Sequence, residues 1–143
     1  MKNIFLFFIL SLFAIFSIQA QDVIGTWKTI DDNTGTAKSY VEIFKGDDGK
    51  IYGKIIKIFN PDIQEVRCTE CKGDDKDQRV IGLTFIRGLE KDGEEYSGGT
   101  ILNPENGKHY KCLIVLENPN KLKVRGYIGF EILGRTQYWI RVS

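Results

Sequence analysis

Residues 107–130, GKHYKCLIVLENPNKLKVRGYIGF, alternate apolar and polar side chains on both sides of an Asn118-Pro-Asn turn. This alternation predicts two half-buried β-strands, 107–117 and 121–130, joined as a hairpin. In the second strand the basic side chains point away from Leu122 and Val124, as on the outer face of a half-buried strand. In the first strand Cys112 shares its face with apolar neighbours, which predicts a buried and unreactive thiol.

The same pattern recurs along the chain after residue 22, and no helical periodicity interrupts it. Asp-Asp-Gly, Lys-Asp-Gly and Glu-Asn-Gly separate the apolar runs with residues that favour turns, and all three prolines fall in the gaps. The pattern predicts an all-β fold, an eight-stranded up-and-down antiparallel barrel, with a two-sheet sandwich as the alternative. The expected strands are 23–30, 37–45, 50–59, 80–89, 94–102, 107–117, 121–130 and 134–142.

The first 20 residues carry the pattern of a secretory signal peptide. Lys2 precedes an apolar run, and Ala20 offers a small residue before the polar Gln21. The run is shorter than the roughly 20 apolar residues that span a bilayer. We therefore expect export to the periplasm or the outside of the cell, a mature chain of residues 21–143 forming a single domain, and no membrane insertion after cleavage.

The charge balance argues against polyanionic partners. The chain has 20 Lys and Arg against 19 Asp and Glu, so removal of Lys2 leaves equal numbers of the two signs. Nucleic-acid binding needs a basic excess to neutralise phosphates, and a polybasic membrane surface needs the same.

The expected turns differ in length between the two ends of the barrel. Turns 46–49, 90–93 and 118–120 share one end and are short, whereas 31–36, 60–79 and 103–106 share the other. The loop 60–79 is long enough to suggest either a lid or a surface ornament. We expect the long-loop end to hold a small apolar ligand against Tyr40, Tyr110 and Phe130, unless the interior is filled by its own side chains.

The only close cysteine pair, Cys68 and Cys71, lies inside this loop. A disulfide is the favoured interpretation because exported thiols usually oxidise. Acidic neighbours and the lack of a following helix argue against a redox dithiol. Zinc needs four ligands, and His109 and Cys112 point to opposite faces of their strand.

Motifs for catalysis are scarce, and we expect no enzymatic activity, metal or cofactor. The single histidine, His109, is interpreted as an exposed bystander, and no glycine-rich phosphate loop or nucleophile elbow is present. The acidic run 73–77 lacks the alternating ligands and the closing glutamate of a calcium loop, and Asp31-x-Asn33-x-Gly35 is interpreted as a turn.

Two resemblances to known families support the predicted barrel. Gly25-Thr-Trp27 resembles the opening of lipocalin-like barrels, in which a basic residue late in the last strand packs across the tryptophan; this implies a structural pair of Trp27 and Arg141. Along the mature chain follow, in order, the stretches GTWKT (25–29), YVEIF (40–44), GKIYGKI (49–55), CTECKGDDKDQRVIGL (68–83), GGTILNPENGKHYKC (98–112), KLKVRGYIG (121–129) and GRTQYWIRV (134–142). By these stretches the whole mature chain resembles the exported bacterial family catalogued as domain of unknown function 2147, which implies a lipocalin-like barrel and no established activity. Arg79 departs from that family, where a proline is common.

Three functional hypotheses follow from the sequence. The first is a binding module for a small apolar ligand, the second a structural or protein-interaction domain of the cell envelope, and the third an envelope thiol protein that uses Cys68 and Cys71. The direction of the last strand's side chains is open: if Arg141 faces Trp27, then Trp139, Gln137 and Arg135 face inward as well.

Overall fold

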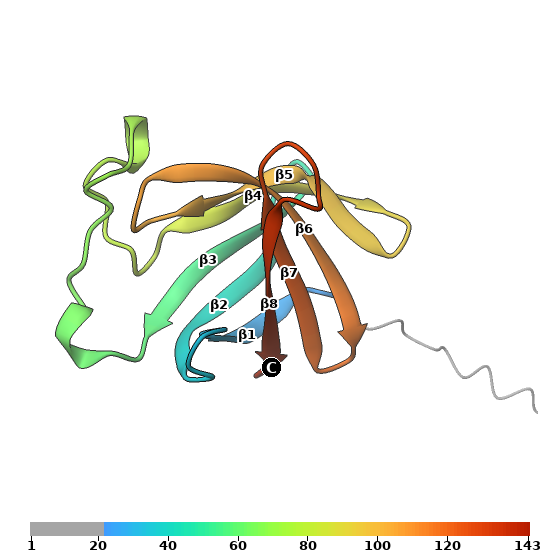
Figure 1. Ribbon diagram of the computed structural model, residues 1–143, viewed down its shortest axis with the longest axis horizontal. Helices are drawn as coiled ribbons and strands as arrows, with labels where there is room; N and C mark the ends of the chain where they lie inside the picture. Colours follow the sequence, from blue (N-terminus) through green and yellow to red (C-terminus); the bar gives the residue numbers. More distant parts are fainter. Residues whose placement is uncertain (1–21) are drawn as a thin grey trace, which may run out of the picture.

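The computed structural model describes residues 22–143, which form one closed barrel of eight antiparallel strands (Figure 1). Each strand pairs with its neighbours in sequence, and β1 pairs with β8 to close the ring. The predicted up-and-down barrel is therefore confirmed, and the sandwich alternative is wrong. The predicted signal peptide, residues 1–20, lies outside the described residues. The strands are β1 (Gly25–Ile30), β2 (Ala37–Lys45), β3 (Ile51–Ile58), β4 (Thr84–Asp92), β5 (Glu95–Asn103), β6 (Lys108–Asn118), β7 (Lys121–Tyr127) and β8 (Gly134–Arg141).

Two expected strands differ from the observed ones by more than two residues at an end, whereas the other bounds agree within two residues. The fourth was expected at 80–89 but runs 84–92, because residues 80–83 form a turn around Gly82, whose φ is 97°. Its far end extends to Asp92 because Gly93 and Glu94 alone make the hairpin turn, with Gly93 at a φ of 63°. The seventh strand was expected to reach residue 130 but ends at Tyr127, before a turn around Gly129.

Apolar side chains fill the end of the barrel with the short turns. Trp27, Val41 and Leu122 are fully buried there, on strands that alternate inward and outward. The chain before β1 covers this end, because the Trp27 indole Nε1 donates to the Val23 carbonyl at 2.8 Å. Val23 is itself buried, so the N-terminal segment acts as a plug.

Arg141 connects this N-terminal segment to the place where β1 meets β8 and the barrel closes, which we call the seam. Its guanidinium lies over the Trp27 ring, 4.3 Å from the centroid, and donates to the carbonyls of Asp22 and Ile24 and, across the end, of Pro119. Burial lowers the pKa of Arg141 from its usual range. Gly25 makes room for this arrangement: it has a φ of 142°, and a Cβ there would meet the Ser143 carbonyl oxygen at 2.4 Å and an Arg141 nitrogen at 2.8 Å.

We expect Arg141→Lys to lower the free energy of unfolding by about 2 kcal/mol, because an ammonium group cannot make three directed hydrogen bonds while it lies on the indole. Lys121 provides a matched control, since its Nζ lies 4.6 Å from the ring centroid of the exposed Tyr138. Lys121→Ala should cost less than about 1 kcal/mol. Urea unfolding followed by tryptophan fluorescence measures both, and equal losses would contradict a special role for Arg141.

Candidate functional site

The end of the barrel with the long loops holds a cavity of about 810 Å³. Its deeper walls are apolar and include Ile55, Phe85 and Trp139, which face one another from β3, β4 and β8. A volume of this size lies within the range of small-molecule sites. The interior is therefore filled by side chains at one end only, and the other end has room for a ligand.

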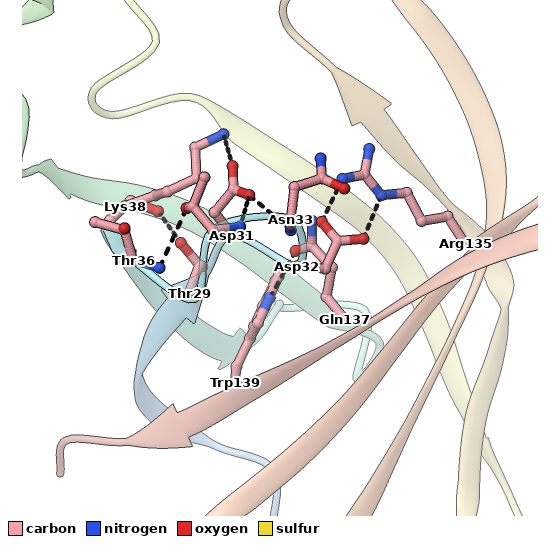
Figure 2. Close-up of polar contacts among 11 residues, drawn as sticks. Thr29, Asp31, Asp32, Asn33, Thr36, Lys38, Arg135, Gln137 and Trp139 are labelled. Atoms are coloured by element: carbon pink, nitrogen blue, oxygen red, sulfur yellow. Dashed lines mark hydrogen bonds and ion pairs between the residues drawn. The ribbon is translucent and has the colours of Figure 1, made fainter.

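Polar side chains surround the mouth of the cavity and are bonded to one another. The hydroxyls of Thr29 and Ser39 are 2.7 Å apart, and the Trp139 indole Nε1 donates to Gln137 Oε1 at 3.0 Å. Figure 2 shows Gln137 and Trp139 below the β1–β2 loop. Because these groups already have partners, the wall offers few unpaired polar atoms to a ligand.

Three of the charged residues that line the cavity, Asp31, Lys38 and Arg135, take part in ion pairs, whereas Arg67 and Glu105 line it without one within residues 22–143. Arg135 at the start of β8 forms a bidentate ion pair with Asp32, which connects the β1–β2 loop to β8 (Figure 2). The hydrogen bonds from Arg135 lower the pKa of Asp32. Lys38 Nζ lies 3.6 Å from Asp31, whose pKa is lowered mainly by the backbone N–H of Asn33. The predicted turn at 31–35 is thus present, with Gly35 N–H donating to the Asp31 carbonyl.

The segment between β3 and β4 forms one wall of the mouth, where it places Ile63, Val66 and Thr69 against the cavity. It contains two short 3₁₀ turns, Pro61–Ile63 and Gly73–Asp75. In Figure 1 it runs, in green, beside the turn between β5 and β6. Segment 60–79 therefore contributes side chains to the cavity, which agrees with its interpretation as a lid and disagrees with its interpretation as a surface ornament. We call it the lid segment.

Three contacts fasten this segment to the barrel. Asp75 accepts two hydrogen bonds from Arg87 on β4, at 2.8 and 2.9 Å, and these lower the pKa of Asp75. The Sγ atom of Cys68 lies 3.5 Å from the Pro104 carbonyl oxygen. Glu70 packs against Gly107 so closely that a Cβ on Gly107 would lie 1.9 Å from the Glu70 carbonyl oxygen. The acidic run thus serves an ion pair; among residues 22–143, no group of three or more His, Cys, Asp and Glu side chains is placed to hold a metal ion.

The cysteines lie as the favoured interpretation has them. Cys68 and Cys71 form a disulfide, with Cα atoms 5.3 Å apart, and both side chains are buried. Cys112 is free, fully buried in the core and separate from the pair. Burial raises the pKa of the Cys112 thiol to about 12, so it stays protonated at neutral pH.

The three residues expected to contact a ligand occupy different places. Tyr110 lines the cavity, and its hydroxyl bonds the Asn106 side chain at 3.1 Å. Tyr40 is on the outer face, since Val41 beside it is buried inside, and its ring packs edge-on against Phe59. Phe130 lies in the β7–β8 loop, 75% exposed, and is absent from the lining of the cavity. The inward direction predicted for Tyr40 and Phe130 is therefore wrong.

Several lining residues were missed or left conditional in the sequence. Trp139, Gln137 and Arg135 line the cavity, whereas Tyr138 and Ile140 are exposed, as expected if Arg141 faces Trp27. Ser39 was overlooked, although alternation with the apolar Val41 and Ile43 marks it as inward. Charged Glu42 marks the face of Tyr40 as outward by the same count.

The chain matches one family model over residues 25–141, described as "Uncharacterized protein conserved in bacteria (DUF2147)". Among solved structures, the barrel is similar to protein HP1028 from the human pathogen Helicobacter pylori, which is described as belonging to the lipocalin family. The TM-score is 0.73 at 22% identity, over 85% of this chain and 84% of that one. At this identity the likeness concerns the fold alone. No curated protein matched the chain.

Gly107→Ala should release the lid segment from the β5–β6 turn. Gly107 has a φ of 71°, and its missing Cβ makes the space for Glu70. Gly35→Ala is a matched control, because Gly35 has a φ of 72° with nothing within 4 Å of the added Cβ. We expect about 1 kcal/mol of destabilisation from Gly35→Ala, the cost of the left-handed backbone, and at least twice that from Gly107→Ala. Limited proteolysis should cut segment 60–79 faster only in the Gly107 variant; equal cleavage rates would contradict the proposed packing.

Thiol counting distinguishes a local disulfide from a reactive dithiol. In the folded protein we expect no alkylation at neutral pH, because Cys112 is buried and protonated. Denaturation without reductant should expose one thiol, and denaturation with reductant should expose three. Intact mass after iodoacetamide treatment gives the count. Two additional alkylated thiols in the folded protein would favour a redox role for Cys68 and Cys71.

Proposed function

Because the chain belongs to the DUF2147 family and folds as a lipocalin-like barrel, we propose that it binds a small apolar ligand in the cavity at the long-loop end. The observation that carries this proposal is the unequal filling of the barrel. Trp27 and its neighbours occupy one half, while the other half keeps about 810 Å³ between apolar walls. An apolar molecule there would remove apolar surface from water, which is favourable in proportion to the area.

The pairing of the polar groups supports an uncharged or weakly polar ligand. The two ion pairs at the mouth, Arg135 with Asp32 and Lys38 with Asp31, balance each other's charge. A strongly acidic head group bound at Arg135 or Lys38 would have to displace a carboxylate from that pair, which costs free energy. The lining also holds Arg67, but Glu105 adds an opposite charge to it. Tyr110 at the rim suits a weakly polar ligand, because its hydroxyl can both donate and accept a hydrogen bond.

The proposal describes a binding protein that uses no cofactor and carries out no catalysis. It also places the mature chain outside the cytoplasm, on the strength of the predicted signal peptide and the disulfide in the lid segment. None of the helices among residues 22–143 is long and apolar enough to cross a membrane. The intact mass of the exported protein reports whether residues 1–20 have been removed.

Titration with a panel of fatty alcohols, fatty acids and hydrophobic dyes should give a saturable signal with one site per chain. Gly126→Leu should weaken binding at least tenfold, because Gly126 lines the cavity and a side chain there points toward Ile101 and Tyr110. Lys123→Leu on the outer face of the same strand is the control and should bind normally. No saturable signal with any member of the panel, from a protein with a normal melting temperature, would refute the proposal.

A further inference from the structure

The loop between β7 and β8, residues 128–133, exposes a cluster of large apolar side chains. Ile128, Phe130, Ile132 and Leu133 are 65%, 75%, 84% and 64% exposed, and only Glu131 among them carries a charge. The loop projects from the rim of the barrel (Figure 1, red, at the top). Monomeric soluble proteins rarely leave such a cluster in water without a partner. We call residues 128–133 the apolar tip.

The backbone of the apolar tip is closed on itself. Ile128 N–H donates to the Leu133 carbonyl at 3.1 Å, and Leu133 N–H donates to the Phe130 carbonyl at 3.0 Å. Two cations from the neighbouring strands bond two further carbonyls: Arg125 Nε donates to the Glu131 carbonyl at 2.7 Å, and Lys111 Nζ donates to the Gly129 carbonyl at 3.4 Å. Unpaired peptide groups are what makes a loop costly to move out of water. Half of the twelve backbone N–H and C=O groups of residues 128–133, four of them carbonyls, have a partner before any contact forms.

From these observations we propose that the apolar tip is an interfacial anchor that docks the barrel reversibly on the surface of a lipid bilayer. A tip of this size offers less than the ~800 Å² that each partner buries in a standard protein interface, so a second copy or a rigid protein would gain little from it alone. A bilayer needs no shaped counterpart, and interfacial binding grows with the apolar area inserted. Lys111 and Arg125, at the base of the loop, lie where lipid phosphates meet an inserted tip.

Docking through the apolar tip would also orient the mouth of the ligand cavity, an inference that rests on the proposed function. Ile128 and Leu133 line the mouth of the cavity as well as the tip. Docking therefore turns the mouth toward the bilayer, so that an apolar ligand can pass between lipid and cavity without crossing water. The contact is peripheral and agrees with the expectation that the mature chain does not insert across a membrane.

The test uses the mature protein without ligand and vesicles of phosphatidylcholine with phosphatidylglycerol. Phe130→Trp should show a shift of its emission to shorter wavelength on addition of vesicles, and quenching by brominated lipid. Trp27 and Trp139 are buried, so their contribution should stay constant. In flotation, Phe130→Ser combined with Ile132→Ser should lower partitioning at least tenfold, because each change removes a large apolar side chain. Binding should weaken only modestly with salt, since equal numbers of opposite charges leave the mature chain without net attraction.

Matched controls separate the tip from general surface hydrophobicity. Ile56 and Val142 are exposed elsewhere, at 37% and 46%, and Ile56→Ser with Val142→Ser should partition like the native protein. Gly126→Leu should also keep vesicle binding, so failure of the ligand site and failure of the anchor are distinguishable. Circular dichroism and thermal melting check that each variant folds. The proposal is overturned if native protein does not float with vesicles, if the tip and control variants lose binding equally, or if sedimentation shows that the tip instead mediates self-association.

Discussion

The contact of Arg141 with Trp27 is the constraint on which the barrel depends. Cα pairing between β1 and β8 is limited to Trp27 with Arg141 and Lys28 with Ile140, the shortest ladder in the ring. The guanidinium compensates for this short ladder by bonding carbonyls on both sides of the seam while it covers the indole. Gly25 belongs to the same unit, because any side chain there would collide with the C-terminal residue and with Arg141. The seam is therefore held by side-chain chemistry where backbone pairing is sparse.

This seam also decides where the cavity lies. Trp27 and the preceding segment take up the space at the end with the short turns, so the cavity is left at the other end. Fixing Arg141 toward Trp27 forces every second residue of β8 inward, and this brings Trp139 and Gln137 to the cavity wall. One contact at the closed end thus determines which side chains of β8 line the open end, through the alternation of that strand.

The sequence predicts this fold well because its information is local: alternation marks each strand, and short polar turns mark each hairpin. It predicts the ligand site less well, because the residues that line a cavity are known only when the inward-pointing residues of every strand are known. In β2, the charged Glu42 and the apolar Val41 indicate which residues point outward and which inward. Tyr40 was wrongly placed inside because its aromatic character was given more weight than this alternation. Phe130 was misplaced for another reason, since the strand stops where Gly129 adopts a left-handed backbone, and apolar alternation continues past that point. The contacts that fasten the lid, such as Arg87 with Asp75, join residues on different elements and leave no local pattern.

A cavity in a small barrel requires an explanation, since collapse of the surrounding loops would bury its apolar walls. The loops here are held by contacts that oppose such collapse. Arg87 and the β5–β6 turn fix the lid segment from outside, and Arg135 holds the β1–β2 loop against β8. The β7–β8 loop has its own internal hydrogen bonds, and while Ile128 and Leu133 line the mouth, Phe130 and Ile132 are exposed away from it. The polar ties at the rim therefore keep apolar surface available, both inside the cavity and at the tip, and a ligand or a bilayer can cover what the chain itself leaves uncovered.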